Sequence, residues 1–120
     1  LEAIAGQGLV GLLYSSDPTV ASVAPHGGLE PRFTPNPMAA GWPTASGPVI
    51  MDVSTSITTN GMVGRLNSQG AKLPGAWLKG PDGDATDDPG VMFRKPSGAL
   101  LPLGGMDAGH KGFAMALKYK

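Results

Sequence analysis

The chain has 120 residues, of which 19 are glycine and 12 are proline, so residues that interrupt regular structure hold about a quarter of its positions. That share approaches the level of disordered segments, but disorder goes with high net charge, whereas nine basic and nine acidic side chains give this chain a formal net charge of zero. We therefore expect one compact domain rich in turns, with no basic surface for nucleic acid or an anionic membrane.

Apolar runs and cysteine content narrow the class further. No run approaches the roughly 18 apolar residues that a membrane-spanning helix needs, and the absence of cysteine excludes a disulfide framework and thiolate chemistry. Both properties fit a cytoplasmic protein. The chain starts at Leu1, residues 1–5 have the pattern of a helix end, and residues 110–120 have helical spacing without a terminating glycine. We therefore expect a segment of a larger protein.

The first half of the chain shows three short strand patterns. Residues 9–14 and 49–53 are apolar runs bounded by turn residues, which predicts two buried strands. Residues 36–43 contain prolines and predict an edge strand, because proline cannot donate to a central ladder. Residues 6–11 match the dinucleotide motif G-x-G-x-x-G, but a helix precedes them and a strand follows, the reverse of what that motif requires. We interpret them as a helix-ending turn.

A helix is expected after the second buried strand. The hydroxyls of residues 54–56 can cap its start, residues 57, 61, 64 and 66 mark one face, and Gly70 ends it. Glycines on that face would let a neighbouring backbone approach closely. Residues 25–28 and 80–84 have the composition of turns, and a final helix follows residues 100–105. The joins are too short for crossover helices, so the sheet should be mixed and mostly antiparallel, which argues against a doubly wound parallel fold.

Two charged residues stand where a strand or a helix is expected to end or begin. Asp52 closes an apolar strand, where it can accept hydrogen bonds from ribose hydroxyls or cap the following helix. Lys111 lies in the glycine-rich residues 104–112, which can bind a phosphate or carboxylate or form a flexible turn. The residues alone leave both pairs of alternatives open.

The histidines and the aspartate-rich segment carry weaker signals. His26 and His110 are the only imidazoles, and neither has a nucleophile or a third metal ligand at a recognisable spacing, so we interpret each as a hydrogen-bonded turn residue. Residues 82–88 hold four aspartates without the glycine and glutamate positions of a calcium loop, which favours a solvated turn.

Eight motifs, read in order, cover most of the chain. They are GLVGL (8–12), SDP (16–18), VAPHGG (23–28), NPMA (36–39), MDVSTS (51–56), LPGAW (73–77), TDDP (86–89) and LPLGG with GHKG (101–105 and 109–112). Together they resemble the malate/L-lactate dehydrogenase family that lacks a Rossmann fold, which also contains ureidoglycolate and sulfolactate dehydrogenases and Δ1-piperideine-2-carboxylate reductase.

This resemblance implies an α/β (α+β) fold with three layers, α/β/α, around a mixed, mostly antiparallel sheet, and residues 1–120 would form a cofactor-binding segment of a larger dehydrogenase. It implies an NAD- or NADP-dependent oxidoreductase that interconverts a 2-hydroxy acid of the malate or L-lactate type and its 2-oxo acid, or reduces a related cyclic imine. It also implies a homodimer. A catalytically silent structural or binding fragment of the same fold is the alternative.

The resemblance also implies residue roles. Contacts to the dinucleotide fall by position on Ser16, Asp52, Val53, Ser54 and Lys111, with Asn36 and Pro25 as further candidates near the cofactor. The proton-transferring histidine of the family belongs to a motif upstream of Leu1, so no catalytic residue and no metal ligand is assigned here. The family commonly has G-T-N-P where this chain has TPNP at residues 34–37, a departure that could alter the turn framing the cofactor.

Overall fold

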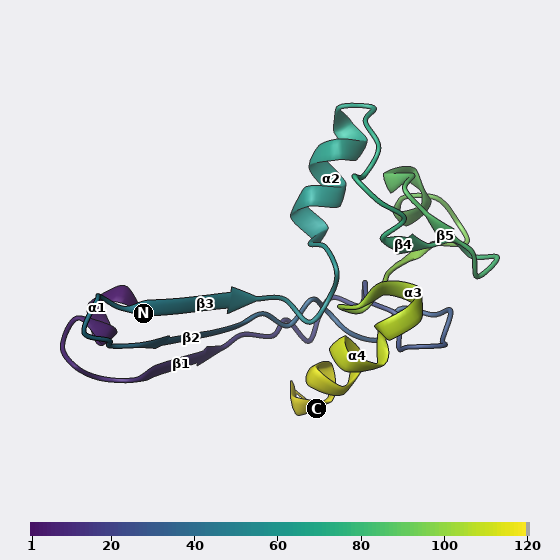
Figure 1. Ribbon diagram of the computed structural model, residues 1–120. Helices are drawn as coiled ribbons and strands as arrows, with labels where there is room; N and C mark the ends of the chain where they lie inside the picture. The colour runs from purple at the N-terminus through teal and green to yellow at the C-terminus, as the bar shows by residue number, and fades with distance from the viewer. Residues whose placement is uncertain (120) are drawn as a thin grey trace.

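The computed structural model describes residues 1–119 as two small antiparallel sheets and several short helices (Figure 1). The first sheet holds β1 (Gly11–Tyr14), β2 (Met38–Trp42) and β3 (Val49–Val53) in the order β1-β2-β3. The second sheet holds β4 (Leu78–Lys79), β5 (Ala85–Thr86) and β6 (Ala99–Leu100) in the order β5-β4-β6. Helices combined with antiparallel strands confirm the predicted α/β class.

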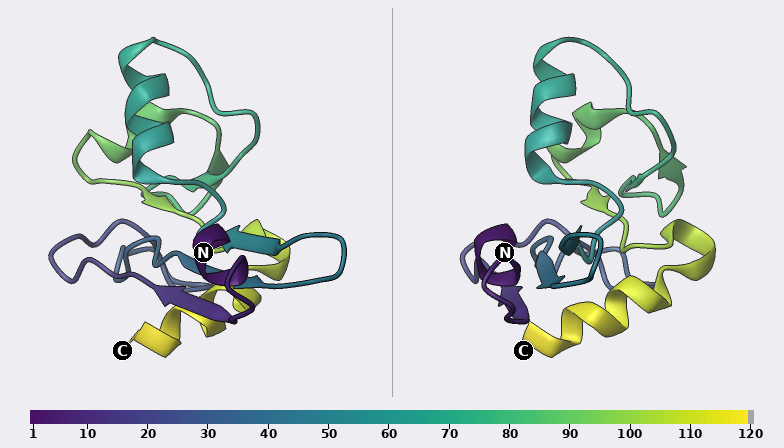
Figure 2. Two further views of the ribbon diagram at one scale, coloured as in Figure 1. Left: turned by 90° about the vertical axis from the view of Figure 1, so that its left-hand side faces the viewer. Right: turned by 60° about the vertical axis from the view of Figure 1, so that its left-hand side comes forward.

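Short helical segments flank both sheets. They are α1 (Glu2–Ala5), α2 (Asn60–Ser68), α3 (Gly105–Ala108), α4 (His110–Ala116) and two 3-10 helices, η1 (Pro89–Met92) and η2 (Leu117–Tyr119). The first sheet extends away from the body of the molecule, with α2 and the second sheet to one side of its inner end and α3 and α4 to the other (Figures 1 and 2). Among residues 1–119, no helix is long and apolar enough to cross a membrane.

β2 is the central strand of the first sheet, so the prediction of an edge strand is wrong. Its Ala40 pairs with Leu12 of β1 on one side and with Met51 of β3 on the other. Pro37 and Pro43 stand just outside the paired residues. Neither proline therefore removes a hydrogen bond from the ladder.

The outer strands β1 and β3 exist as predicted, but they are exposed rather than buried. Leu12 is 64% exposed and Ile50 is 45% exposed, because the sheet stands clear of α2 and the second sheet (Figure 1). Short apolar runs bounded by turns indicated the strands correctly. Burial of these strands would also require a second layer of helices or strands packed on the sheet, and the pattern of apolar residues within a strand does not indicate whether such a layer is present.

A pair of glycines lets α1 pack on the first sheet. Gly11 and Gly41 lie opposite each other in the β1–β2 register. A Cβ at Gly11 would lie 2.7 Å from Leu1 Cδ2, and one at Gly41 would lie 3.1 Å from Leu1 Cβ. Because neither glycine has a side chain, the first residues of the chain can pack directly against the backbone of this pair. Residues 6–8 then form the predicted helix-ending turn, with Gly8 at φ 78°.

The hydrophobic core joins the second sheet to α2 and α4. It consists of Val23, Phe33, Val63, Leu73, Leu78, Leu100 and Ala116. Leu78 and Leu100 are partners in the β4–β6 register, and both are fully buried. The Phe33 and Phe113 rings pack edge to face with their centroids 5.5 Å apart. This contact holds α4 against the segment that leads into β2.

The start of α2 differs from the prediction, and its end agrees with it. Thr59, not a hydroxyl of residues 54–56, caps the helix, because its Oγ1 accepts a hydrogen bond from the Met62 amide at 3.2 Å. Gly70, at φ 63°, ends the helix region as predicted. A Cβ at Gly61 or Gly64 would meet nothing within 4 Å, so the expected close approach of a neighbouring backbone is wrong.

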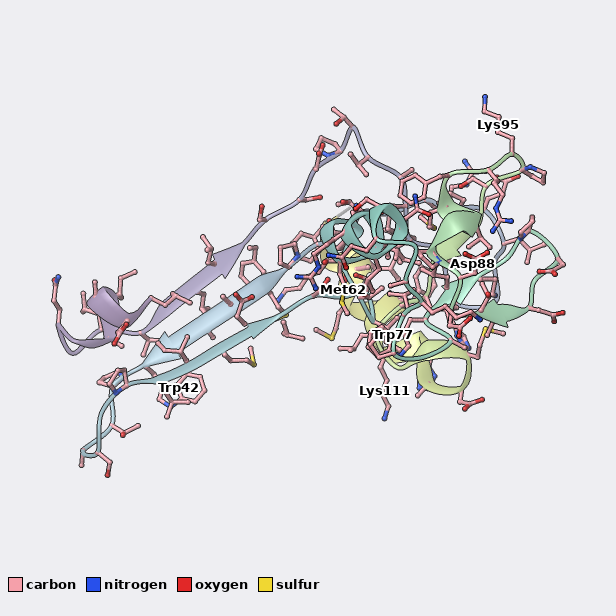
Figure 3. All side chains as sticks on the ribbon, turned by 90° about the horizontal axis from the view of Figure 1, so that it is seen from above. Trp42, Met62, Trp77, Asp88, Lys95 and Lys111 are labelled. Carbon is pink, nitrogen blue, oxygen red and sulfur yellow. The ribbon has the colours of Figure 1, made fainter. Side chains whose placement is uncertain are left out.

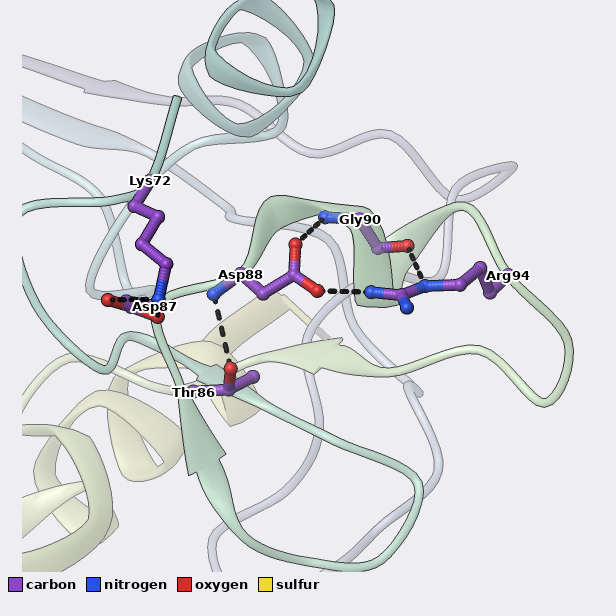
Figure 4. Close-up of polar contacts among 6 residues, drawn as sticks. All are labelled: Lys72, Thr86, Asp87, Asp88, Gly90 and Arg94. Carbon is purple, nitrogen blue, oxygen red and sulfur yellow. Dashed lines mark hydrogen bonds and ion pairs between the residues drawn. The ribbon is translucent and has the colours of Figure 1, made fainter. Parts of the chain in front are cut away.

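The aspartate-rich segment forms the predicted turn only in its first part, at residues 81–83; β5 follows, and polar contacts then hold Asp87 and Asp88 (Figure 4). The Asp88 carboxylate accepts a hydrogen bond from the Gly90 amide at 2.9 Å and another from the Arg94 guanidinium. Lys72 Nζ lies 3.0 Å from Asp87 Oδ1. These aspartates therefore cap η1 and pair with neighbouring cations.

Asp88 should stabilise the fold only while it is ionised. The hydrogen bond from the Gly90 amide, more than the Arg94 contact, holds the pKa of Asp88 below its ordinary value of 3.8. Its contribution is therefore present above that pH and is lost as the pH falls through the lower pKa of the folded state. We expect Asp88→Ala to lower the Tm at neutral pH, and Asp88→Asn, which keeps an acceptor for Gly90, to lower it less. Thermal melts at neutral and strongly acidic pH check this, and a Tm difference between wild type and Asp88→Ala that persists unchanged in acid would contradict it.

Candidate functional site

Most of the predicted cofactor residues meet at one end of the first sheet. Because neighbouring strands are antiparallel, the end of β1, the start of β2 and the end of β3 lie together. Tyr14, Met38 and Val53 are aligned partners there. Within two residues of these partners stand Ser16, Asn36, Asp52, Val53 and Ser54, which we call the sheet-end cluster.

Ser16 and Asn36 are joined directly. Ser16 Oγ donates a hydrogen bond to Asn36 Oδ1 at 2.7 Å, and Asn36 is only 3% exposed. The backbone of Asn36 has φ 44°, a left-handed conformation that asparagine tolerates better than most residues. The segment that departs from the family pattern, residues 34–37, therefore still presents its asparagine to Ser16.

A cavity of about 220 Å³ opens beside this pair. Its polar lining includes Ser16, Asp17, Arg32, Asn36 and Tyr119. The Arg32 guanidinium also pairs with the Glu30 carboxylate, and both side chains are mostly exposed. Hydroxyl, amide, guanidinium and carboxylate groups thus surround one space, a set that suits the hydroxyls of a sugar.

The end of the described chain also reaches the sheet-end cluster. The Tyr119 hydroxyl donates to the Pro37 carbonyl at 2.9 Å, and Lys118 Nζ donates to the Tyr14 hydroxyl at 2.9 Å. Burial raises the pKa of Tyr119, so its hydroxyl remains protonated at neutral pH. Sequence reasoning missed this contribution because each partner lies at least 82 residues away along the chain.

Asp52 is an exposed strand residue and not a helix cap. It pairs with Ala39 across the β2–β3 ladder and lines a second cavity of about 130 Å³ together with Leu13 and Ser15. The neighbouring Val53 is half-buried and ends β3. The Asp52 carboxylate therefore remains available to a ligand. Of the two alternatives that the sequence left open, a helix cap and a ligand contact, the structure excludes the helix cap.

One carbonyl oxygen clamps the segment that follows β3. Pro35 O accepts hydrogen bonds from Ser54 Oγ at 2.9 Å, from the Thr55 amide at 2.9 Å and from Thr55 Oγ1 at 2.8 Å. Ser54 Oγ lies 2.9 Å from Ser56 Oγ as well. The hydroxyl of Ser54 is therefore held at Pro35, the residue that precedes Asn36 in the chain.

Lys111 lies outside the sheet-end cluster, at the start of α4, with its side chain pointing away from the fold (Figure 3). The next residue, Gly112, packs against the segment after β3. Its amide donates to Leu103 O at 3.1 Å, and a Cβ there would lie 2.5 Å from Thr55 O. The backbone next to Lys111 therefore packs close to Thr55, the residue that follows Ser54. Lys111 itself does not line the cavity beside Ser16.

Pro25 also lies apart from the sheet-end cluster, in the predicted tight turn. The Gly28 amide closes this turn on Pro25 O at 3.0 Å. The rings of His26 and His110 pack edge to face with centroids 5.7 Å apart. His26 lies in a turn as predicted and His110 begins α4, but within residues 1–119 neither imidazole makes the expected hydrogen bond, and a ring contact takes its place.

Known proteins are similar to this chain along almost its whole length. The family model described as malate/L-lactate dehydrogenase matches residues 1–119. A Δ1-pyrroline-2-carboxylate reductase of Ancylobacter novellus is 44% identical over 96 residues, which cover 79% of this chain and 26% of that protein.

Solved structures of similar proteins also superpose on almost the whole of this chain. The Δ1-piperideine-2-carboxylate reductase of Pseudomonas syringae superposes with a TM-score of 0.79 at 37% identity, over 98% of this chain and 33% of its own. The malate dehydrogenase of Entamoeba histolytica superposes with a TM-score of 0.80 at 28% identity, over 98% of this chain and 34% of its own. The chain therefore spans about a quarter to a third of the length of these relatives. With sequence and fold in agreement over residues 1–119, the chain belongs to the malate/L-lactate dehydrogenase family.

Proposed function

We propose that residues 1–120 form a cofactor-binding segment of an NAD- or NADP-dependent oxidoreductase. Members of this family use NAD(P)H, and the similar proteins include imine reductases and a malate dehydrogenase. Pyrroline-2-carboxylate and malate both carry a carboxylate beside the carbon that gains or loses hydride. We infer a small acid of this kind as the substrate, either a 2-hydroxy acid with its 2-oxo acid or a cyclic imine.

The observation that carries this proposal is the sheet-end cluster. Five residues selected on resemblance, and scattered over nearly forty positions, meet at one end of the first sheet. Ser16 and Asn36 line one cavity, and Asp52 lines a second one. A catalytically silent fragment of the same fold would keep the register that brings these positions together, but it would not need hydroxyl, amide and carboxylate groups at them.

The residues present suit one part of a dinucleotide. The cavity of about 220 Å³ beside Ser16 is smaller than the roughly 300–1,000 Å³ of a site that encloses a drug-sized ligand. It has room for a ribose or a phosphate group, and Ser16, Asn36 and Arg32 offer partners for their oxygens, while the Asp17 carboxylate in the same lining favours the uncharged ribose. When bound, the nicotinamide supplies the hydride. The residues of this chain bind and orient it.

Proton transfer is not assigned to this chain. His26 and His110 contact each other rather than the sheet-end cluster, and neither matches the histidine motif that the family resemblance implies. We therefore expect the 120-residue chain to bind cofactor without turnover. The homodimer and the cytoplasmic location remain predictions.

Removal of an exposed charge tests cofactor binding without disturbing the core. We expect NADH or NADPH to quench Trp42 and Trp77 emission saturably. Lys111→Ala should weaken the affinity by about 1–3 kcal/mol, or roughly 5- to 150-fold in Kd, if Lys111 makes a charged hydrogen bond to the cofactor. The matched control is Lys95→Ala, which removes the same charge from an exposed loop residue.

Asp52→Ala is the companion variant, because Asp52 belongs to the sheet-end cluster and is exposed. A Kd that rises with Asp52→Ala or Lys111→Ala and stays constant with Lys95→Ala supports the proposed site. Absence of saturable quenching with both nucleotides, in a chain shown to be folded by circular dichroism, favours the silent fragment instead.

A further inference from the structure

A buried lysine in β4 has no role in the sheet-end cluster. Lys79 is only 5% exposed. Its Nζ donates one hydrogen bond, to the Gly28 carbonyl at 3.0 Å. Among residues 1–119, no carboxylate lies within 4 Å of this nitrogen. An ammonium has three donors, so two of them lack a protein partner in the part of the chain that the structure describes.

Such an arrangement is unfavourable unless something completes it. Moving an ammonium out of water costs several kcal/mol, and an opposite charge or further acceptors normally offset that cost. A single carbonyl supplies only one acceptor. Among residues 1–119, Lys79 is also the only buried residue with a charged side chain.

A small cavity lies between Lys79 and the turn whose Gly28 carbonyl accepts the hydrogen bond from Nζ. It has a volume of about 70 Å³, and its lining includes Lys79, Pro25, His26, Gly27, Leu101 and Pro102. A water molecule takes up about 30 Å³, so the space fits two waters or a single carboxylate or phosphate group. A whole nucleotide cannot enter it.

Apart from Lys79, the wall of the cavity combines one imidazole with glycine and apolar residues. His26 lines it, and the His110 ring packs against His26 with a centroid separation of 5.7 Å. Leu101 and Pro102 are buried and form an apolar wall, which lowers the local dielectric and strengthens an interaction between Nζ and an anion. Oxygen atoms of an anion would satisfy the two remaining donors of Lys79 and neutralise its charge.

We propose that the cavity at Lys79 binds one oxyanion group, with Lys79 Nζ as the principal donor. The two sources consistent with its size are a phosphate of the dinucleotide and the carboxylate of the substrate. The choice between these sources rests on the proposed function, whereas the oxyanion site itself does not.

Two-dimensional ¹H–¹⁵N NMR of the chain tests this site directly. Titration with inorganic phosphate, and separately with acetate, should shift the amides of Gly27, Gly28, Lys79 and Gly105 saturably. Lys79→Met, which keeps an unbranched side chain of similar length, should weaken the stronger of the two ligands by about tenfold or more. Lys95→Met, the matched control at an exposed position, should leave the Kd unchanged.

The outcomes separate the sources and the proposals. Stronger binding of phosphate identifies the dinucleotide as the source, stronger binding of acetate identifies the substrate carboxylate, and either supports the site. Shifts that are absent, or that Lys79→Met leaves unchanged, overturn it. If Lys79→Met loses its dispersed spectrum, the wild-type map decides, and shifts centred on Lys111 or the sheet-end cluster overturn the site. Oxyanion binding without any NAD(P)H binding overturns the proposed function alone.

Discussion

Leu100→Ala is expected to lower the free energy of unfolding by about 2–5 kcal/mol, the usual effect of truncating a fully buried leucine. Leu100 has no exposed surface and pairs with Leu78. Its amide donates to Ser22 O at 2.8 Å and its carbonyl accepts from the Ala24 amide at 3.1 Å. Because the backbone is held on both sides, the surrounding structure cannot collapse into the space that the side chain leaves.

Urea denaturation of wild type and variant measures this difference. The matched control is Leu117→Ala, which removes the same atoms from a side chain that is 50% exposed and should change stability by about 0.5 kcal/mol or less. Equal destabilisation by the two variants would show that the core does not lie where the structure puts it.

Gly112→Ala is expected to destabilise the fold by about 1–3 kcal/mol through overpacking. The added Cβ would collide with the Leu103 amide and would lie 2.5 Å from Thr55 O. Both neighbours are backbone atoms, and Leu103 N donates to Thr55 O at 2.8 Å. Three segments therefore cross at this glycine, and a methyl group there pushes α4 away from the segment that follows β3.

The matched control for this variant is Gly64→Ala in α2, where a Cβ would meet nothing within 4 Å. Because alanine favours a helix over glycine by up to about 1 kcal/mol, Gly64→Ala should be neutral or stabilising. Opposite signs for the two substitutions in urea denaturation are the expected result. Equal stability of the two variants would contradict the close crossing at Gly112.

The strands and turns were predictable because their signals are local. Residues 9–14 and 49–53 are apolar runs bounded by turn residues, and the structure places β1 and β3 within them. The predicted helix-ending turn follows α1 and contains Gly8, and Gly70 follows α2 as predicted; both glycines have positive φ angles. Burial of β1 and β3 could not be predicted, since it depends on which layers meet, and the prolines misplaced β2 because they flank its ladder instead of entering it.

The candidate site was predictable only in part. Resemblance selected Ser16, Asn36 and Asp52, and the antiparallel register explains why they meet. Tyr119 and Arg32 were missed because tertiary contacts, not spacing, bring them to the same cavity. Lys79 was missed for a different reason. A lysine in a two-residue strand is expected at the surface, and no sequence pattern indicates that the turn at residues 25–28 covers it.

The two prolines beside Asn36 have a consequence for binding. Each proline restricts its own backbone, so the unfolded chain has fewer conformations at residues 35 and 37. The three hydrogen bonds to Pro35 O then fix this segment against residues 54 and 55. The Ser16–Asn36 pair is therefore already ordered in the free chain. A ligand that binds beside this pair loses little affinity to ordering the protein, because the loss of conformational entropy at these residues has already occurred on folding.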